Sequence, residues 1–126
     1  MSALGIDEVG SESFRAVPRR ENERLVLEFS GSGDMSAIPL VAEFLKQVHA
    51  TAQLETVVEV CCDFRQLTFM NSSCFKSFVV WIDTVKNAER RYQILFLTDA
   101  NHHWQRRSLE ALRRLAANIV TIDTRA

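Results

Sequence analysis

The chain has 126 residues, of which 47% are hydrophobic and 25% are charged, and its formal net charge is −1. This length and composition indicate one globular domain with a core of its own, and only four glycines and two prolines exclude a collagenous or low-complexity chain. No apolar run approaches the roughly 18 residues of a membrane span, and no basic segment precedes an apolar stretch near the amino end. We therefore expect a cytoplasmic protein without a membrane partner.

The distribution of charge bears on nucleic-acid binding, and the cysteine content bears on the redox compartment. Residues 1–63 carry 11 acidic and 5 basic side chains, a balance of −6, whereas residues 64–126 carry 5 acidic and 10 basic ones, a balance of +5. Such an excess is small, and no aromatic-rich basic strand accompanies it, so we expect no nucleic-acid partner. Three cysteines, an odd number, fit a reducing compartment without a disulfide framework.

The first elements predict a lead-in followed by a hairpin and a helix. Residues 1–13 are polar and without period, which predicts a flexible amino-terminal lead-in and leaves residues 14–126 as a single domain. A strand begins near 14–17, and a turn at 18–23 leads to alternating apolar residues at 25, 27 and 29. After a glycine-containing turn at 31–34, apolar residues at spacings of three and four predict a helix over 36–50.

The rest of the chain alternates between strands and helices. Residues 56–63 form a nearly continuous β-branched run, typical of a strand covered on both faces. A helix over 71–88, a strand over 92–98, a helix over 104–116 and a strand over 118–122 follow. We expect an α/β fold, a small mixed β-sheet of four to five strands flanked by three to four helices, with the first strand pair antiparallel and the later strands parallel.

The segment Asn71-Ser72-Ser73 stands where a strand gives way to a helix. Such side chains commonly cap a helix by accepting hydrogen bonds from its free amides. The same position also suits a phosphate, because the unpaired N–H groups and the positive end of the helix dipole attract an anion. Both interpretations stay open on the residues alone.

A longer segment carries a family resemblance. Residues 63–75, DFRQLTFMNSSCF, resemble the signature of STAS domains, the anti-sigma-factor antagonist family, and the turn Gly31-Ser32-Gly33-Asp34 resembles that family's Gly-x-x-Asp turn. The order of elements from about Phe14 to Ile122 also fits a STAS-like domain. Asn71 stands where the commoner family pattern has an acid, as in a bacterial branch with an Asn-Ser-Ser loop.

The resemblance implies a non-enzymatic switch in protein–protein interaction, without cofactor or metal. A serine kinase of the anti-sigma type would phosphorylate Ser72, and a metal-dependent protein phosphatase would reverse the modification. The implied partner-binding residues are Asp34, Asn71, Ser72, Ser73, Cys74 and Lys76. We expect a monomer or a weak dimer.

Two other functions remain open. The domain could be a constitutive STAS-like adaptor in which Ser72 is never modified. It could also have a redox or thiol-dependent role at Cys74, because a helix amino terminus lowers the pKa of a thiol. A metal site is not expected, because Cys61 and Cys62 point to opposite faces of a strand, and His102 and His103 lack the spacing of metal ligands on a helix.

Overall fold

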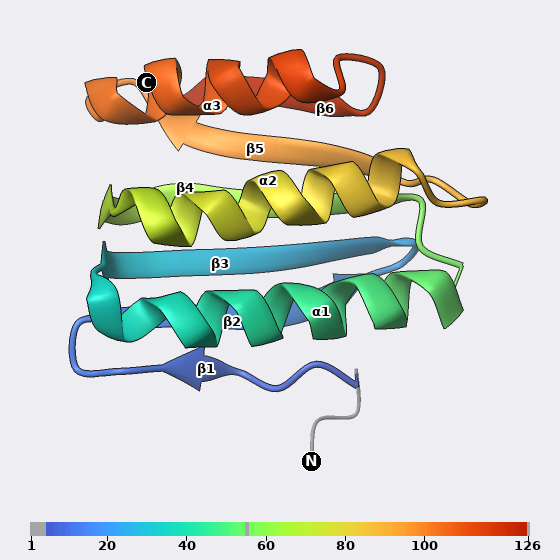
Figure 1. Cartoon of the computed structure of the whole chain (residues 1–126), viewed down its shortest axis with the longest axis horizontal. Coiled ribbons are helices and arrows are strands. Elements are labelled where there is room, and N and C mark those ends of the chain that lie inside the picture. Colours follow the sequence, from blue (N-terminus) through green and yellow to red (C-terminus); the bar gives the residue numbers. More distant parts are fainter. Residues whose placement is uncertain (1–4, 55, 126) are drawn as a thin grey trace.

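The computed structural model describes residues 5–54 and 56–125 as one β-sheet with three α-helices on one of its faces (Figure 1). The strands are β1 (Val9–Gly10), β2 (Phe14–Glu21), β3 (Arg24–Gly33), β4 (Glu59–Met70), β5 (Gln93–Asp99) and β6 (Val120–Arg125). The helices are a short 3-10 helix η1 (Met35–Ala37), α1 (Ile38–Leu54), α2 (Ser72–Lys86) and α3 (His103–Leu115). None of the helices described is both long enough and apolar enough to cross a bilayer.

The sheet is mixed, as the sequence predicts, but it has six strands rather than four or five. Neighbours in the sheet are also neighbours in sequence, in the order β1 to β6. The strands β1, β2 and β3 pair antiparallel, and β3 to β6 pair parallel. The additional strand is β1, in which Val9 pairs with Ala16 and Gly10 with Arg15.

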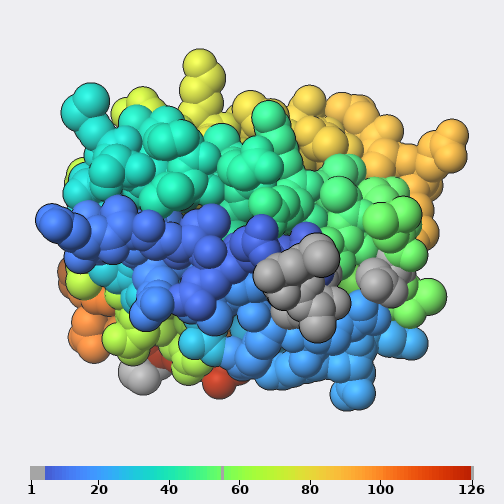
Figure 2. All heavy atoms as spheres, turned by 90° about the horizontal axis from the view of Figure 1, so that it is seen from below, coloured from blue at the N-terminus to red at the C-terminus, as the bar shows by residue number. Residues whose placement is uncertain are grey.

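The amino-terminal segment differs from the flexible lead-in predicted over residues 1–13. Residues 1–4 lie outside the described residues, but Ile6 is fully buried and the Asp7 amide donates a hydrogen bond of 2.8 Å to the Gln47 side chain of α1. Figure 2 shows this segment lying along the molecule between α1 and β2. From residue 5 onward the segment therefore belongs to the fold, because Ile6 joins the core and Val9 packs against it.

The main core lies between the sheet and the helices and is built around aromatic rings. Phe29 of β3 contacts Phe44 of α1, Phe64 of β4 and Phe78 of α2 edge-to-face, at centroid distances of 5.8, 5.2 and 5.7 Å. This geometry is the one that aromatic quadrupoles prefer. Side chains from all three helices join this core, so the helices cover one face of the sheet.

Within residues 5–54 and 56–125, no helix covers the other face of the sheet, which differs from the prediction that residues 56–63 are covered on both sides. Cys61 and Cys62 do point to opposite faces, as predicted. Cys62 lies in the main core, whereas Cys61 packs with Val26 and Leu97 on the open face. Glu59, an outlier in the apolar run, has an ion-pair partner there in Arg24, with 3.0 Å between Oε1 and Nε.

The strand β4 continues beyond residue 63 and carries two extra residues relative to β3. Glu28 pairs with Asp63 but Ser30 pairs with Gln66, and a second shift follows after Gly31. Each shift bulges β4, which bends a strand and re-aims its end. The two bulges lie directly before the loop at residue 71, so they set the direction in which the chain enters α2.

Candidate functional site

The turn at 31–34 and the loop at 71–73 lie side by side. The predicted turn is shorter than residues 31–34, because β3 runs to Gly33 and still pairs there with β4. β3 and β4 are parallel, so their carboxyl ends meet at one edge of the sheet. The Asn71 amide donates to the Gly33 carbonyl at 2.8 Å, and the Cys74 thiol donates to the Asp34 carbonyl at 3.6 Å. The fold therefore brings together the two segments that carry the family resemblance.

Asp34 holds the turn together with its carboxylate. It accepts from the Ser13 hydroxyl at 2.7 Å, and from the Ser36 amide and hydroxyl at 3.0 and 2.6 Å. Hydrogen bonds from Ser36 and Ser13 lower the pKa of Asp34. Within the turn Gly31 has φ +84°, and a Cβ there would stand 2.0 Å from the Ser13 carbonyl oxygen. Asp34 thus links the segment before β2, through Ser13, to η1, through Ser36.

The loop at 71–73 begins α2 in the way that the capping interpretation predicts. Asn71 is the N-cap residue, and its side-chain oxygen accepts from the Cys74 amide at 2.9 Å. Ser72 is the first residue of α2, and both Ser72 and Ser73 are exposed. The remaining amides of this first turn have no partner within the helix. The Ser72 hydroxyl therefore stands on the surface at the positive end of a helix dipole.

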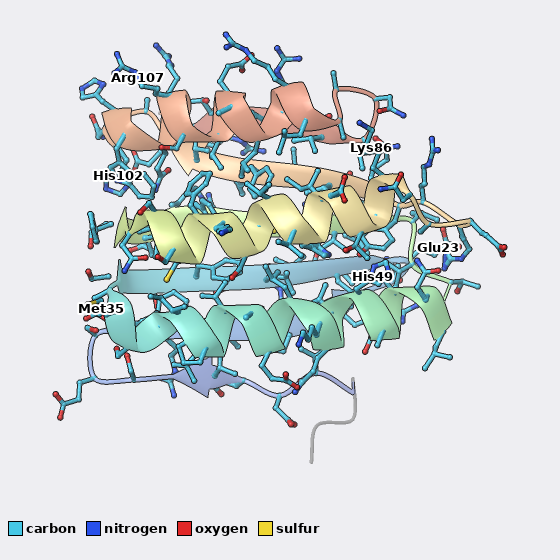
Figure 3. All side chains as sticks on the ribbon, viewed as in Figure 1. Glu23, Met35, His49, Lys86, His102 and Arg107 are labelled. Carbon is cyan, nitrogen blue, oxygen red and sulfur yellow. The ribbon has the colours of Figure 1, made fainter. Side chains whose placement is uncertain are left out.

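The other helices begin at the same end of the molecule. In Figure 3, Met35 of η1 and His102, directly before α3, lie at the end where α2 also starts. Because β3, β4 and β5 are parallel, each delivers the chain to a helix at this edge. Three helix amino termini converge there, an arrangement whose dipoles favour an anion.

Large apolar side chains are exposed close to this loop in the sequence. Met35 directly follows Asp34 and is 78% exposed, and Phe69 lies two residues before Asn71 and is 50% exposed. Met and Phe are enriched in protein–protein interfaces relative to the rest of the protein surface. Neither residue was singled out from the sequence, because exposure of an apolar side chain depends on the tertiary fold.

Cys74 does not fit the role that the sequence suggested. Its side chain is fully buried, so it does not lie on a surface that a partner touches. Burial, with the nearby Asp34 carboxylate, raises the pKa of the Cys74 thiol, whereas the helix-terminus argument predicted a lowered one. The direction is opposite to the predicted one, because burial and a neighbouring negative charge both disfavour the thiolate. The thiol packs beneath the loop as a small apolar group.

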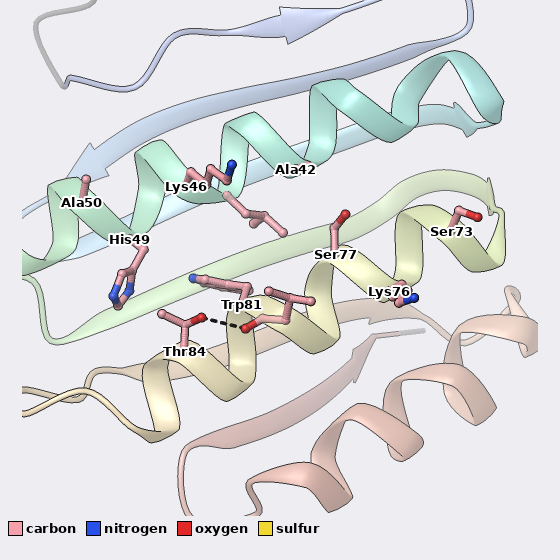
Figure 4. A pocket seen from close by; sticks show the side chains of 11 residues that line it. Ala42, Lys46, His49, Ala50, Ser73, Lys76, Ser77, Trp81 and Thr84 are labelled. Carbon is pink, nitrogen blue, oxygen red and sulfur yellow. Dashed lines mark hydrogen bonds between the residues drawn. The ribbon is translucent and has the colours of Figure 1, made fainter.

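Ser73 and Lys76 face a different feature from the loop itself. Both line a groove between α1 and α2 with a volume of about 410 Å³ (Figure 4). Two of the six predicted partner-binding residues, Asn71 and Ser72, lie at the start of α2, and Asp34 caps the neighbouring helix η1. Of the other three, Cys74 is buried, and Ser73 and Lys76 line the groove. The six are close in space but do not form one continuous surface.

The structure also assigns a positioning role to Gln105, which sequence reasoning left unassigned. This α3 side chain is fully buried. Its amide nitrogen donates to the carbonyls of Phe64, within the first bulge of β4, at 2.7 Å and of Leu67, just after it, at 2.8 Å. The bulge frees carbonyls from the strand ladder, and Gln105 satisfies them. A polar residue on the apolar side of a helix was the only signal available.

A second polar contact missed at the sequence level joins three elements. The Trp81 indole N–H of α2 donates to the Tyr92 hydroxyl at 2.9 Å, and His49 Nδ1 of α1 lies 2.8 Å from the same hydroxyl. Burial lowers the pKa of His49. In the part of the chain that the structure describes, no group of His, Cys, Asp and Glu side chains has the arrangement of a metal site.

Comparisons with known proteins bear on the fold. No family model matches the sequence, and no curated protein matches it. Two solved structures are similar. An anti-sigma factor antagonist from Mycobacterium paratuberculosis has a TM-score of 0.65 at 14% identity, covering 84% of this chain and 85% of its own. The anti-sigma factor antagonist SpoIIAA, in its unphosphorylated form, has a TM-score of 0.56 at 13% identity, with 86% and 88% covered. The chain therefore has the STAS-like fold of the anti-sigma factor antagonists.

Proposed function

We propose that this domain is a non-enzymatic signalling domain whose contact with a partner protein is switched by phosphorylation of Ser72. The observation that carries the proposal is the exposed Ser72 hydroxyl on the first residue of α2, at the edge where three helices begin. A hydroxyl in that place is open to a kinase, and its phosphate meets free amides rather than a buried surface.

A phosphate on Ser72 would change the surface without unfolding it. It adds roughly −1.5 to −2 charges at neutral pH, which the amino terminus of α2 accommodates. The same charge would enter any contact that uses the apolar Met35 and Phe69, and burying it there without a cationic partner is costly. Phosphorylation would therefore weaken an apolar contact at this edge while leaving the fold intact.

The proposed partners are a serine kinase of the anti-sigma type and a metal-dependent protein phosphatase. The shared fold with anti-sigma factor antagonists supports this choice, and one of those proteins was solved in its unphosphorylated form. Ser72 is proposed as the acceptor rather than Ser73, because Ser73 faces the groove between α1 and α2. The proposed location is the cytoplasm.

A constitutive adaptor is the second candidate function. The strongly exposed Met35 and Phe69 favour it, because both could anchor a partner without any modification of Ser72. A redox role of Cys74 has no such support, since the thiol is buried and its pKa is raised.

The test compares the affinity of variants for the anti-sigma-type kinase of the source organism. Ser72→Ala should bind within about threefold of the parent, since it loses only a small surface hydroxyl. Ser72→Glu should bind at least about tenfold more weakly, equivalent to about 1.4 kcal/mol, because it places a charge in the contact. Ser73→Ala, the matched control, should change nothing, and kinase treatment should add the mass of one phosphate to all variants except those at Ser72. Equal affinity of Ser72→Ala and Ser72→Glu for the kinase would contradict the phosphorylation switch and favour the constitutive adaptor.

A further inference from the structure

The groove between α1 and α2 has the size and lining of a small-molecule site. Its volume of about 410 Å³ lies within the range of roughly 300–1,000 Å³ for ligand pockets. Leu45 of α1 and Trp81 and Val80 of α2 provide apolar surface, and Val80 is 59% exposed. In Figure 4 the side chains of His49 and Trp81 point into the space between the helices.

One polar side chain of this groove, His49, is oriented by contact with a buried hydroxyl. An indole N–H can only donate, so Trp81 uses one lone pair of the Tyr92 oxygen. The Tyr92 hydroxyl is buried, and His49 Nδ1 lies 2.8 Å from it, within reach to accept its proton. With that hydrogen bond in place, a neutral His49 carries its proton on Nε2. The hydrogen bonds that join Trp81, Tyr92 and His49 then leave the Nε2–H of His49, a groove-lining residue, as a donor for a ligand.

The charge of the groove has one sign. Lys46 of α1 and Lys76 of α2 line it from opposite helices, and none of its described lining residues is acidic. Among the described residues neither ammonium has an ion-pair partner. Several arginines of the described chain do form ion pairs, as Arg65 does with Asp63 at 2.8 Å. Two unpaired cations beside an apolar channel are complementary to an anion with an apolar tail.

We propose that this groove binds a small amphipathic carboxylate, a medium-chain fatty acid or an arylalkanoate. The carboxylate pairs with Lys46, with the Nε2–H of His49 one helical turn further along α1 as a second donor, and Lys76 supplies the opposing positive charge from α2. The tail lies against Trp81, Leu45 and Val80. This inference stands apart from the proposed switch, because it requires no modification of Ser72 and no protein partner.

Binding is tested on the full chain with decanoate as the probe, by titration calorimetry and by amide and indole NMR shifts. The expected result is saturable binding of one decanoate, with shifts concentrated on α1 and α2 and including the Trp81 indole N–H. Decanol, which has the same tail and no charge, should bind at least tenfold more weakly, and decyltrimethylammonium should not bind.

Variants separate the charge from the shape of the groove. The double variant Lys46→Gln, Lys76→Gln should lose at least tenfold in affinity for decanoate and keep its affinity for decanol. The matched control Arg106→Gln, Arg107→Gln removes the same charge from α3 and should bind decanoate as the parent does. Ser77→Phe, which fills the groove from α2, should abolish both ligands, and NMR mapping on the parent chain keeps the test valid if that variant does not fold.

Several outcomes would overturn the proposal. One is no binding of decanoate at millimolar concentration, and another is equal affinity of decanoate and decanol. If decanoate shifts NMR signals only outside α1 and α2, the carboxylate binds at another surface. If the chain binds vesicles of anionic lipid but not free decanoate, the anion it recognises is a lipid headgroup. Groove shifts that follow protein concentration rather than decanoate would assign the groove to a second copy of the chain.

Discussion

Replacing Gln105 by leucine removes the side chain that holds the bulged strand before the candidate site. Gln105 is fully buried and donates to the Phe64 and Leu67 carbonyls, at 2.7 and 2.8 Å. Leucine has a similar volume and no donor. The variant therefore leaves two buried carbonyls without this partner while it creates no large cavity.

The magnitude follows from those two acceptors. Leaving a buried acceptor unsatisfied costs about 1–3 kcal/mol, and the apolar gain of leucine offsets part of that cost. We expect Gln105→Leu to lower the free energy of unfolding by about 2–4 kcal/mol, measured by urea denaturation with an unchanged slope. The neighbouring exposed change Arg106→Gln is the control and should stay within about 0.5 kcal/mol of the parent.

A second variant at the same position distinguishes hydrogen bonding from packing. In Gln105→Glu an ionised carboxylate would face two carbonyl oxygens, so the folded state raises its pKa above the unfolded value of about 4.3. Its loss of stability should therefore be smallest below that pH and should grow as the pH rises through the raised pKa. If Gln105→Leu behaves like Arg106→Gln, or if the loss in Gln105→Glu is independent of pH, the carbonyls have other partners and the reasoning fails.

Four further outcomes are expected. Gly31→Ala should lower the free energy of unfolding by more than about 1 kcal/mol, because its φ is +84° and a Cβ would meet the Ser13 carbonyl at 2.0 Å; a neutral effect in urea denaturation would show that the turn relaxes. The three thiols are buried, so Ellman's reagent should react slowly with the native chain and rapidly after denaturation, and a fast native thiol would revive the redox function. Burial lowers the pKa of His49, so the unfolded chain takes up its proton first; stability should fall as the pH drops below about 6.5, and His49→Gln should flatten that slope. Electrophoretic mobility of DNA or RNA should not change at submicromolar protein in about 150 mM salt.

Much of the fold could be predicted from the sequence because periodicity is a local property. The α1, α2 and α3 helices each place apolar residues on one side of the helix, and the pattern of spacings marks them within a few residues. The antiparallel β2–β3 pair follows from a short turn, and the parallel strands follow from the helices that separate them. The opposite faces of Cys61 and Cys62 follow from the strand period of two. The N-cap role of Asn71 follows from its position before an apolar-periodic segment.

Other features depend on which surfaces meet. The sixth strand, β1, exists only because β2 offers a free edge, and two residues such as Val9 and Gly10 carry no strand signal of their own. Ile6 is a core residue because the segment before β1 lies against the helix side of the sheet, which one apolar residue in a polar segment does not reveal. The prediction of a second covering layer over residues 56–63 failed because a short apolar run does not reveal whether helices or neighbouring side chains cover it.

The candidate site likewise has some features that the sequence determines and others that only the tertiary structure determines. The sequence by itself determined that a helix begins at the Asn71-Ser72-Ser73 segment and that Asp34 lies in a turn before a helix, because caps and turns have local chemical signatures. Only the tertiary structure decided that the two segments touch, that Gln105 satisfies the bulge before them and that Cys74 is sealed beneath them. It also decided that Lys46 and Lys76 face one groove, since facing across two helices is set by how α1 and α2 pack. Local chemistry specifies which groups a segment offers, whereas burial and pairing arise only from contacts between residues far apart in the chain.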